Sequence, residues 1–281
     1  MLIRVVASGF NPIEWKVRSG EMAQALERDL PAVLGWECAG VVEKRGSDVR
    51  EFAVGDAVLA LTPFSRDGTH AEFVAVEQAH LAHKPASLSF EHAAAVPMTA
   101  QAAWSLLDAS GSQQGKRVLV LGAGGSVGHW LVQLVKQQGA QVCATASGLD
   151  VQAVLALGAD DVLDHRKMSI EQFAPVDTVF DLVGGTTQAS AWKLVKAGGQ
   201  LLSIASPPNA SLAVQPDVRG QFVFTQPRGT VLAEIAKRID AGRLVPLAVS
   251  SVRPLDDIAD IHAQAEAGSL RGKTVLRIGA A

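Results

Sequence analysis

A glycine-rich turn between an aliphatic run and an amphipathic segment constrains the fold of this chain more than any other feature. The aliphatic run is Arg117–Leu121, and glycines follow it at positions 122, 124, 125 and 128. Apolar residues recur at helical spacing in the next stretch, His129–Gln138. A strand that enters a helix through such a turn lets the backbone approach a pyrophosphate, whose charge then lies at the amino end of the helix. The segment therefore predicts a strand, a turn and a helix that together bind a dinucleotide.

The residues of this turn are the candidate cofactor-binding residues. They are Gly122, Gly124, Gly125, Ser126, Val127 and Gly128. Any tight turn between a strand and a helix favours glycine, so a purely structural turn stays open as the alternative. The context favours cofactor binding, because a second predicted strand, Gln141–Ala146, arrives about 20 residues after the first glycine, where dinucleotide folds place the residue that reads the ribose.

The residues after this second strand predict the type of cofactor. An acid there would hydrogen-bond the 2′-hydroxyl of NAD and repel a 2′-phosphate. No Asp or Glu lies between Gly122 and Ser147, and the first acid is Asp150, so the sequence favours NADP(H) with Ser147 at the ribose. The positive partner of the phosphate would be Arg166 or Lys167, after the third predicted strand, with ordinary exposed charges as the alternative.

The rest of the chain divides into a β-rich first third and an α/β remainder. Short β-rich segments separated by Gly, Pro and Asp predict strands at Leu2–Ala7, Gly40–Glu43, Ala57–Leu61 and Ala71–Val76. From about Ser89, apolar runs alternate with helical stretches, which predicts a doubly wound parallel sheet. Its predicted strands are Arg117–Leu121, Gln141–Ala146, Asp161–Leu163, Thr178–Leu182, Gln200–Ile204 and Gln221–Thr225. Beyond Pro227 follow a helix at Val231–Ala241, a strand at Pro246–Val252, a helix at Asp256–Ala267 and a strand at Thr274–Ile278.

Composition excludes several classes of function. The 281 residues include 25 Lys and Arg against 28 Asp and Glu without a long run of either sign, so binding to nucleic acid or anionic lipid is unsupported. The uncharged run Val118–Val135 is long enough for a membrane span, but glycines interrupt it, so we expect no membrane segment. Cys38 and Cys143 are too few for a disulfide framework, and Met1–Phe10 lacks a signal-peptide pattern, so we expect a cytoplasmic protein.

Ordered segments along nearly the whole chain carry a family resemblance. They are Gly9–Gly20, Gly35–Val42, Gly55–Val58, Gly68–Glu72, Pro97–Ala102, the glycine turn, Leu157–Asp160 and Arg271–Leu276. In this order they resemble the zinc-independent, quinone-oxidoreductase branch of the medium-chain dehydrogenase/reductase superfamily. The resemblance implies an α/β fold in which a Rossmann doubly wound sheet, residues 96–222, follows the first part of a GroES-like catalytic domain, residues 1–95. Residues 223–281 would return to complete that discontinuous β domain.

The amino end departs from the pattern of this family. Its members usually carry about thirty more residues before the segment equivalent to Met1, so the resemblance implies a GroES-like domain that is shortened there, with unpaired strand edges and exposed apolar surface. The zinc site departs too. Zinc-dependent relatives use a cysteine near Asn11 and a histidine where this chain has Trp36. The seven histidines show no tight ligand spacing, so we predict no metal, and a zinc alcohol dehydrogenase is the disfavoured alternative.

The remaining chemistry is hydride transfer to an acceptor that is already electrophilic, either a quinone or an α,β-unsaturated carbonyl. The resemblance implies that Asn11 lies beside the nicotinamide and donates to a carbonyl oxygen, with a simple turn residue as the alternative. Thr99 would contact the nicotinamide end, or else its hydroxyl bonds back to its own helix. Lys16 would stabilise an enolate or hydroquinone oxyanion, or else it is a surface lysine beside Glu14.

Two further expectations concern mechanism and assembly. The chain contains no tyrosine, so the tyrosine-acid mechanism of mitochondrial-type enoyl-thioester reductases is excluded. Gln221–Thr225 is an apolar strand at the expected sheet edge, which in the family pairs across a twofold axis and so implies a homodimer. A nonenzymatic NADPH-binding protein of the same fold stays open as an alternative function.

Overall fold

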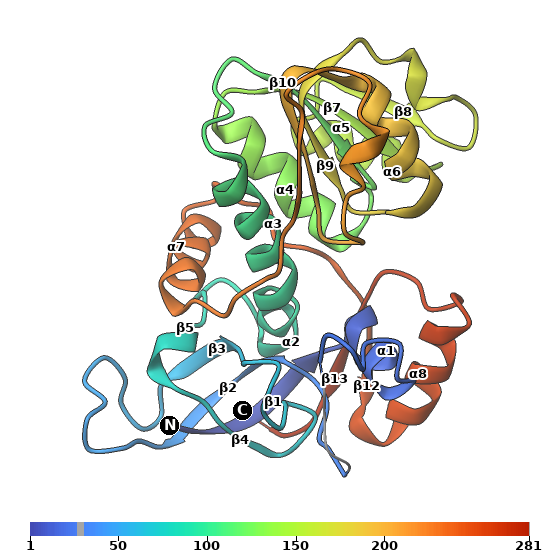
Figure 1. Ribbon diagram of the computed structural model, residues 1–281. Helices are drawn as coiled ribbons and strands as arrows, with labels where there is room; N and C mark the ends of the chain where they lie inside the picture. Colours follow the sequence, from blue (N-terminus) through green and yellow to red (C-terminus); the bar gives the residue numbers. More distant parts are fainter. Residues whose placement is uncertain (27–30, 281) are drawn as a thin grey trace. The chain divides into compact units, whose positions relative to one another are not determined.

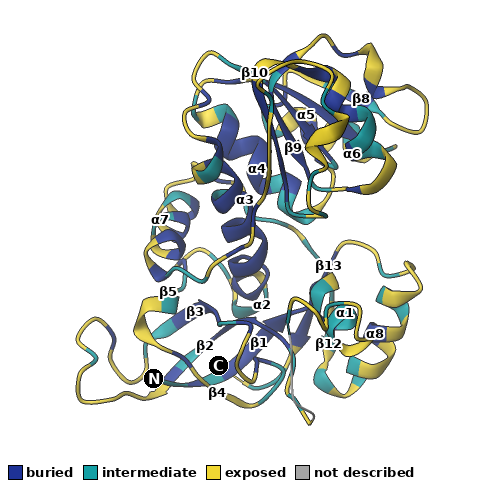
Figure 2. Ribbon diagram, in the orientation of Figure 1, coloured by how far each residue is buried: buried dark blue, intermediate teal, exposed yellow. Residues whose placement is uncertain are grey.

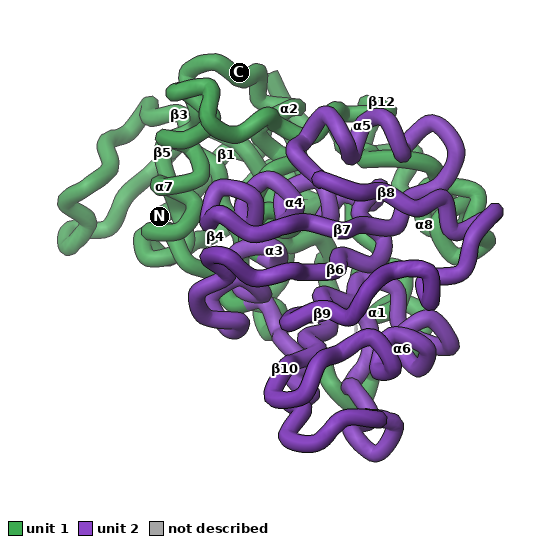
Figure 3. Tube along the Cα trace, turned by 90° about the horizontal axis from the view of Figure 1, so that it is seen from above, with its two compact units in different colours: residues 1–101, 226–281 green, residues 102–225 purple. Residues whose placement is uncertain are grey.

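The computed structural model describes residues 1–26 and 31–280 and divides them into two compact units (Figure 3). The first unit contains residues 1–101 and 226–281, and the second contains residues 102–225. The predicted divisions, after residues 95 and 222, lie a few residues before these two boundaries. The carboxyl-terminal segment thus belongs to the same unit as the amino-terminal one.

The first unit is built on a seven-stranded sheet (Figure 1). Its strands are β1 (Leu2–Gly9), β2 (Glu37–Lys44), β3 (Ala57–Leu61), β4 (Phe73–Ala75), β5 (Leu81–His83), β12 (Val249–Pro254) and β13 (Lys273–Arg277). They run in the order β12-β13-β1-β2-β3-β5, with β4 paired to β1. β13 pairs antiparallel with β1, with Val275 opposite Gly9, so the end of the chain completes the sheet that its beginning starts.

Helices accompany this sheet in the first unit. They are α1 (Pro12–Arg18), α2 (Phe90–Ala94), α7 (Gly229–Asp240) and α8 (Ile258–Glu266), while α3 (Pro97–Ser110) begins in the first unit and ends in the second. α1 begins directly after Asn11, because Pro12 has the fixed φ of a first helical residue and lacks the N–H that a helix start cannot use. This sharp turn from strand β1 into α1 places Asn11 in the interior, where it is buried.

The second unit is a six-stranded sheet in which every pair is parallel. Its strands are β6 (Arg117–Leu121), β7 (Gln141–Ala146), β8 (Asp161–Asp164), β9 (Val176–Asp181), β10 (Val195–Ser203) and β11 (Arg219–Phe222), in the order β11-β10-β9-β6-β7-β8. The helices between them are α4 (Ser126–Gln137), α5 (Asp150–Ala156) and α6 (Gly185–Ala191). The strand order reverses between β6 and β9, which is the doubly wound arrangement that the sequence predicts.

Burial follows position in this second sheet (Figure 2). The central strands β6 and β9 are mostly buried, because helices cover a parallel sheet on both faces, whereas all four residues of the edge strand β11 are exposed. The predicted strand Gln221–Thr225 is wrong in its bounds: pairing with β10 covers Arg219–Phe222, so it begins two residues earlier than predicted and ends before Val223 and Phe224. The apolar pattern there reflects Val223, which is buried beyond the strand.

Edges of the first sheet carry exposed apolar side chains. Phe73 on β4 is 45% exposed and Val252 on β12 is 40% exposed. The sequence missed β5, because three residues are too few for an alternating pattern. No helix in the parts of the chain that the structure describes is both long and apolar enough to span a membrane.

Candidate functional site

The glycine turn of the second unit is held by the neighbouring strand. Gly122 has φ +78°, a left-handed conformation that a residue with a Cβ rarely adopts. Its N–H donates to Thr145 Oγ1 at 3.0 Å, and the N–H of Ala123 donates to Thr145 O at 2.9 Å. The end of β7 therefore fixes the path of the chain between β6 and α4.

Two later glycines let α4 begin close to the strand. The N–H of Gly125 donates to Gly122 O at 3.1 Å, and a Cβ on Gly128 would lie 2.5 Å from Ala123 Cα, closer than real atoms pack. The first N–H groups of a helix have no partner inside it, and the helix dipole adds positive character there. Ser126 and Val127 thus present donors at the start of a twelve-residue helix, and this glycine-lined turn fits a pyrophosphate.

The turn after β7 brings together residues that are far apart in sequence. Ser147 is half-buried, and Arg166 Nη1 lies 3.9 Å from the position that a Cβ would take on Gly148. Asp164, at the end of β8, holds the backbone of this arginine, since its Oδ1 accepts from the N–H of Arg166 at 3.1 Å. Lys167 Nζ instead lies 3.7 Å from Asp164 Oδ2, and its side chain is 78% exposed. Of the two candidate cations, Arg166 is therefore the one beside the Ser147 turn.

An acid also lies against the glycine turn. A Cβ on Gly124 would lie 2.9 Å from Asp150 Cβ and 3.2 Å from Asp150 Oδ2. The sequence treats Asp150 only as the first acid beyond the ribose position. The structure places its carboxylate directly at the second glycine, where a dinucleotide backbone would approach.

Asn11 in the first unit belongs to a group of four buried polar residues, which we call the buried ionic cluster: Asn11, Glu14, Glu37 and Lys273. The amide of Asn11 is bonded on both sides, since its Oδ1 accepts from Lys273 Nζ at 2.6 Å and its Nδ2 donates to Glu37 Oε1 at 2.8 Å. Its second amide contact, from Nδ2 to Glu14 Oε1, is 3.5 Å long. The backbone N–H of Asn11 donates to Glu14 Oε2 at 2.8 Å.

Lys273 has three acceptors inside this cluster. Besides Asn11 Oδ1, its Nζ donates to Glu37 Oε1 at 2.5 Å and to the backbone oxygen of Phe10 at 3.1 Å. Glu37 Oε2 in turn accepts from the N–H of Met98 at 2.8 Å. One ammonium thus ties together β13, β2, the start of α1 and, through Glu37, the start of α3.

Burial controls the protonation of Glu14. It raises the pKa of this carboxyl to about 8, while the ammonium of Lys273 partly opposes the rise and the carboxyl of Glu37 adds to it. Glu14 therefore holds a proton at neutral pH. The cluster then contains one ion pair, Lys273 with Glu37, and a neutral carboxyl beside it.

Phe10, which precedes Asn11, packs between two imidazoles. Its ring centroid lies 6.3 Å from that of His70 and 5.0 Å from that of His262. Burial lowers the pKa of both histidines to about 4, so neither carries a charge at neutral pH. The segment that carries Asn11 is thus held by packing as well as by the cluster.

Comparison with known proteins identifies the family. Residues 1–86 match the alcohol dehydrogenase GroES-like domain, and residues 157–276 match the zinc-binding dehydrogenase domain. The human mitochondrial NAD(P)H oxidoreductase RTN4IP1 is 32% identical over 99% of this chain and 81% of its own length. The chloroplastic NADPH-dependent alkenal/one oxidoreductase of Arabidopsis thaliana is 34% identical over 98% and 71%. The structure of the quinone oxidoreductase from Coxiella burnetii superposes with a TM-score of 0.90 at 31% identity, over 99% of this chain and 90% of that one.

The chain belongs to the zinc-independent branch of the medium-chain dehydrogenase/reductase superfamily. The resemblance and the fold class predicted from the sequence are confirmed. As a member of this branch the protein is an oxidoreductase that uses a nicotinamide cofactor. The Rossmann turn described above supplies the residues that would hold that cofactor.

The predicted catalytic residues of this dehydrogenase/reductase lie in different surroundings. Thr99 is buried in α3, and its Oγ1 donates to Ala95 O at 3.3 Å, as the alternative interpretation expects. Lys16 lies on α1 with a side chain that is 35% exposed, and its Nζ is 3.1 Å from Glu21 Oε1. Only Asn11 belongs to the buried ionic cluster. The roles of all three residues in catalysis stay predictions.

Sequence reasoning missed three residues of the cluster. Glu14 was considered only as the neighbour of Lys16, and its burial was not predicted: the side chain is fully buried. Glu37 and Lys273 lie in segments that carry the family resemblance but were not among the predicted site residues. The available signal was a charged residue at the start of a strand. Lys273 is the first residue of β13, and Glu37 is the first residue of β2. Such charges are rarely buried unless they are paired, so the two could have been predicted as partners.

Trp36, which the family resemblance places where zinc-dependent relatives have a histidine, is fully buried. Its ring centroid lies 5.4 Å from that of Phe64, and it packs with Leu61 and Met98. It is therefore a core residue and not the wall of a pocket. Within residues 1–26 and 31–280, no group of three His, Cys, Asp or Glu side chains could hold a metal ion.

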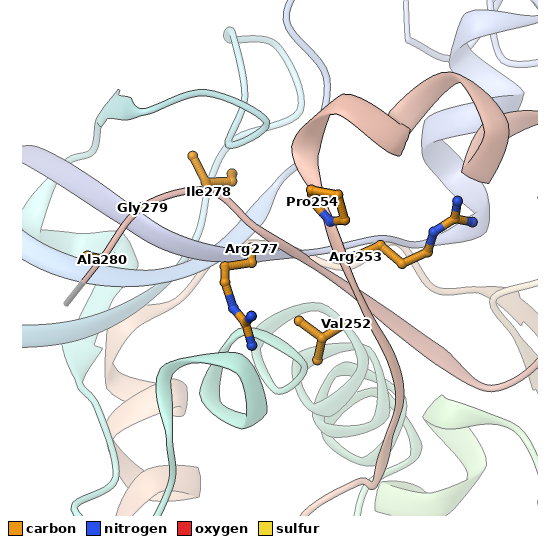
Figure 4. Close-up of a pocket in the computed structure, with 7 residues that line it drawn as sticks. All are labelled: Val252, Arg253, Pro254, Arg277, Ile278, Gly279 and Ala280. Atoms are coloured by element: carbon orange, nitrogen blue, oxygen red, sulfur yellow. The ribbon is translucent and has the colours of Figure 1, made fainter.

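A cavity of about 520 Å³ lies in the first unit at the ends of β12 and β13 (Figure 4). Its two arginines point away from one another, and both are paired. Arg253 bonds Asp257 and Asp260 at 2.9 and 2.8 Å, and Arg277 bonds Glu91 at 3.1 Å. Because no polar groups converge on this cavity, we do not assign it a ligand.

Proposed function

We propose that the protein is an NADPH-dependent reductase that delivers hydride to a quinone or to an α,β-unsaturated carbonyl. The observation that carries the cofactor preference is the guanidinium of Arg166 beside the turn at Ser147, because a 2′-phosphate requires a cation at the ribose. The acceptor class is supported by the relatives, of which one is named a quinone oxidoreductase and another an alkenal/one oxidoreductase.

Residues of the second unit would bind and orient the cofactor. The donors of Ser126 and Val127 at the start of α4 would hold the pyrophosphate, and Gly122, Gly124 and Gly125 form the turn that leads into this helix. Ser147 and Arg166 take the 2′-phosphate. The bound nicotinamide supplies the hydride, so the protein needs only to position the acceptor and stabilise the negative charge that forms on its oxygen.

Residues of the first unit would stabilise that charge. The Asn11 hydrogen that reaches Glu14 Oε1 at 3.5 Å is the most weakly held donor of the buried ionic cluster, so it is the one available to an acceptor oxygen. Lys273 and Glu37 fix the other side of the same amide. Thr99 would contact the nicotinamide end, and Lys16 would supply an ammonium to the oxyanion.

A cofactor-consumption screen tests this function. The protein should oxidise NADPH with 1,4-benzoquinone, 9,10-phenanthrenequinone or an alkenal, and NADH should be a poorer donor. Arg166→Met should raise KM for NADPH about tenfold and leave KM for NADH unchanged, whereas Lys167→Met is the matched control that changes neither. Protection by NADPH in a thermal melt without turnover on any acceptor would favour the nonenzymatic alternative. Chelator-sensitive alcohol oxidation would favour the zinc alcohol dehydrogenase.

We also propose a homodimer that pairs through the edge strand β11. All four of its residues are exposed, and the side chains of Phe222 and Phe224 are 41% and 39% exposed. An exposed strand edge with apolar side chains is a template for pairing with a second copy. Phe222→Asp should convert a dimer to a monomer in analytical ultracentrifugation, and Phe73→Asp, at the edge of the other sheet, should not. A monomeric parent protein would contradict the proposal.

A further inference from the structure

The acid at the glycine turn has no role in the function proposed above. Asp150 is the first residue of α5, and its backbone N–H donates to Ser147 O at 3.1 Å. Gly148 has φ +54° and closes this tight turn. The backbone therefore fixes where Asp150 lies, and its carboxylate is directed at Gly124 by the local fold.

Two opposite charges lie near the same turn. Arg166 Nη1 is 3.9 Å from the Cβ position of Gly148, and Asp150 Oδ2 is 3.2 Å from the Cβ position of Gly124. The backbone N–H of Arg166 donates to Asp164, and the side chains of both Arg166 and Asp150 are exposed. A ligand at this turn therefore meets a carboxylate and a guanidinium at once.

NAD(H) and NADP(H) differ only at the 2′ position of the adenosine ribose, which carries a hydroxyl in one and a phosphate in the other. Asp150 and Arg166 would favour opposite groups at this position. A ribose 2′-hydroxyl can donate to a carboxylate, as it does in NAD-binding folds. A 2′-phosphate would pair with the guanidinium but would be repelled by the carboxylate. In NAD-binding folds the acid stands at the end of the second strand, which here is β7 and ends at Ala146. Asp150 would supply the same group from the start of the following helix.

We propose that Asp150 is a specificity-determining residue that accepts the ribose 2′-hydroxyl of NAD(H) and weakens binding of the 2′-phosphate of NADP(H). The enzyme then binds both NADPH and NADH. Arg166 raises the affinity for NADPH relative to NADH, and Asp150 reduces this difference in affinity. The inference rests on the proposed function, since it assigns the residues of the same cofactor site.

Binding of cofactor fragments tests this without any turnover. Affinities for 2′,5′-ADP and 5′-AMP are measured by isothermal titration calorimetry on the full chain and on Asp150→Asn, which keeps the size of the side chain and removes its charge. The variant should raise the ratio of 2′,5′-ADP to 5′-AMP affinity about tenfold, and Arg166→Met should lower it by a similar factor.

A matched control removes an equal charge from the same unit. Asp161 is exposed at the start of β8, where it pairs with Cys143, whereas the turn follows the other end of β7. Asp161→Asn should therefore change the ratio less than twofold. The same variants are compared with NADP⁺ and NAD⁺, for which the same order is expected.

The outcomes separate the two claims. If both fragments bind and Asp150→Asn leaves their ratio within twofold of the parent value, Asp150 does not read the 2′ position, while the proposed function stands. An equal gain for both fragments would also overturn the assignment, because it would reflect general repulsion of phosphate. If neither fragment binds the parent protein, the cofactor site itself is misplaced and both proposals fail.

Discussion

The buried ionic cluster of the first unit and the Ser147–Asp150 turn of the second use the same chemical groups in opposite ways. Each contains acidic and basic side chains, but the cluster is buried and matches Lys273 with acceptors of its own, whereas Asp150 and Arg166 are exposed at their turn. Buried charges must satisfy one another, because water cannot. The cluster therefore fixes the position of Asn11, and the turn is left to recognise a ligand.

The largest effect is expected when the buried cation of the cluster, Lys273, is removed. Lys273→Met leaves the buried carboxylate of Glu37 without its cation and removes a donor to the Asn11 carbonyl, so we expect the free energy of unfolding to fall by about 3–5 kcal/mol. The measurement is urea unfolding. Lys44→Met, an exposed lysine of the same sheet, is the matched control and should change the free energy by less than about 0.5 kcal/mol. Equal stability of the two variants would mean that the cluster is not sealed from water.

The protonation of Glu14 gives the next largest effect. Its pKa is about 8 in the folded protein against an ordinary value of 4.5, so between these pH values the folded state keeps a proton that the unfolded chain has lost. The free energy of unfolding should therefore fall as pH rises across this window, by up to about 1.4 kcal/mol per pH unit. Glu14→Gln cannot ionise and resembles the neutral carboxyl, so it should remove this loss.

Melting temperatures of the parent and Glu14→Gln proteins between about pH 5 and pH 8 measure the difference. The two should be close at the acidic end, and the variant should be more stable at the basic end. Parallel curves would show that Glu14 is ionised in the folded protein at neutral pH, and that the cluster tolerates two carboxylates beside Lys273.

A smaller effect is expected at the cofactor turn, where packing and not charge sets the geometry. A Cβ at position 128 would meet the backbone of Ala123 at 2.5 Å, so Gly128→Ala should destabilise the protein by about 1–3 kcal/mol despite the higher helix propensity of alanine. Gly46→Ala is the control, because nothing lies within 4 Å of its Cβ position. Urea unfolding should separate the two variants, and only Gly128→Ala should lose protection by NADPH. Two equally stable variants would show that α4 can move away from the strand.

The two regions also differ in how much of them the sequence predicts. The bounds of β3, β6 and β7 are those predicted, because each is an apolar run that ends at glycine or polar residues. The glycine turn could also be predicted, because its residues are neighbours in the sequence. The burial of Glu14 was not predicted, since the charged residues that act on it include Lys273, which lies 259 positions later in the sequence. The closeness of Asp150 to Gly124 likewise depends on the shape of the turn after β7, which sequence spacing does not fix.

The smallest expected effect concerns Lys16, a partly exposed lysine of the first unit, in contrast with the buried Lys273. Lys16 is partly exposed and paired with Glu21, and exposed pairs contribute less than about 1 kcal/mol, so Lys16→Met and Glu21→Gln should have nearly the stability of the parent protein. Their turnover should differ. If Lys16 supplies its ammonium to the oxyanion, Lys16→Met lowers kcat/KM for the acceptor about tenfold, while Glu21→Gln, which keeps the ammonium and removes only its partner, does not. Unchanged kcat/KM in Lys16→Met would assign this lysine to the surface ion pair, and the stabilisation of the oxyanion would then fall to Asn11, whose position depends on the buried lysine instead.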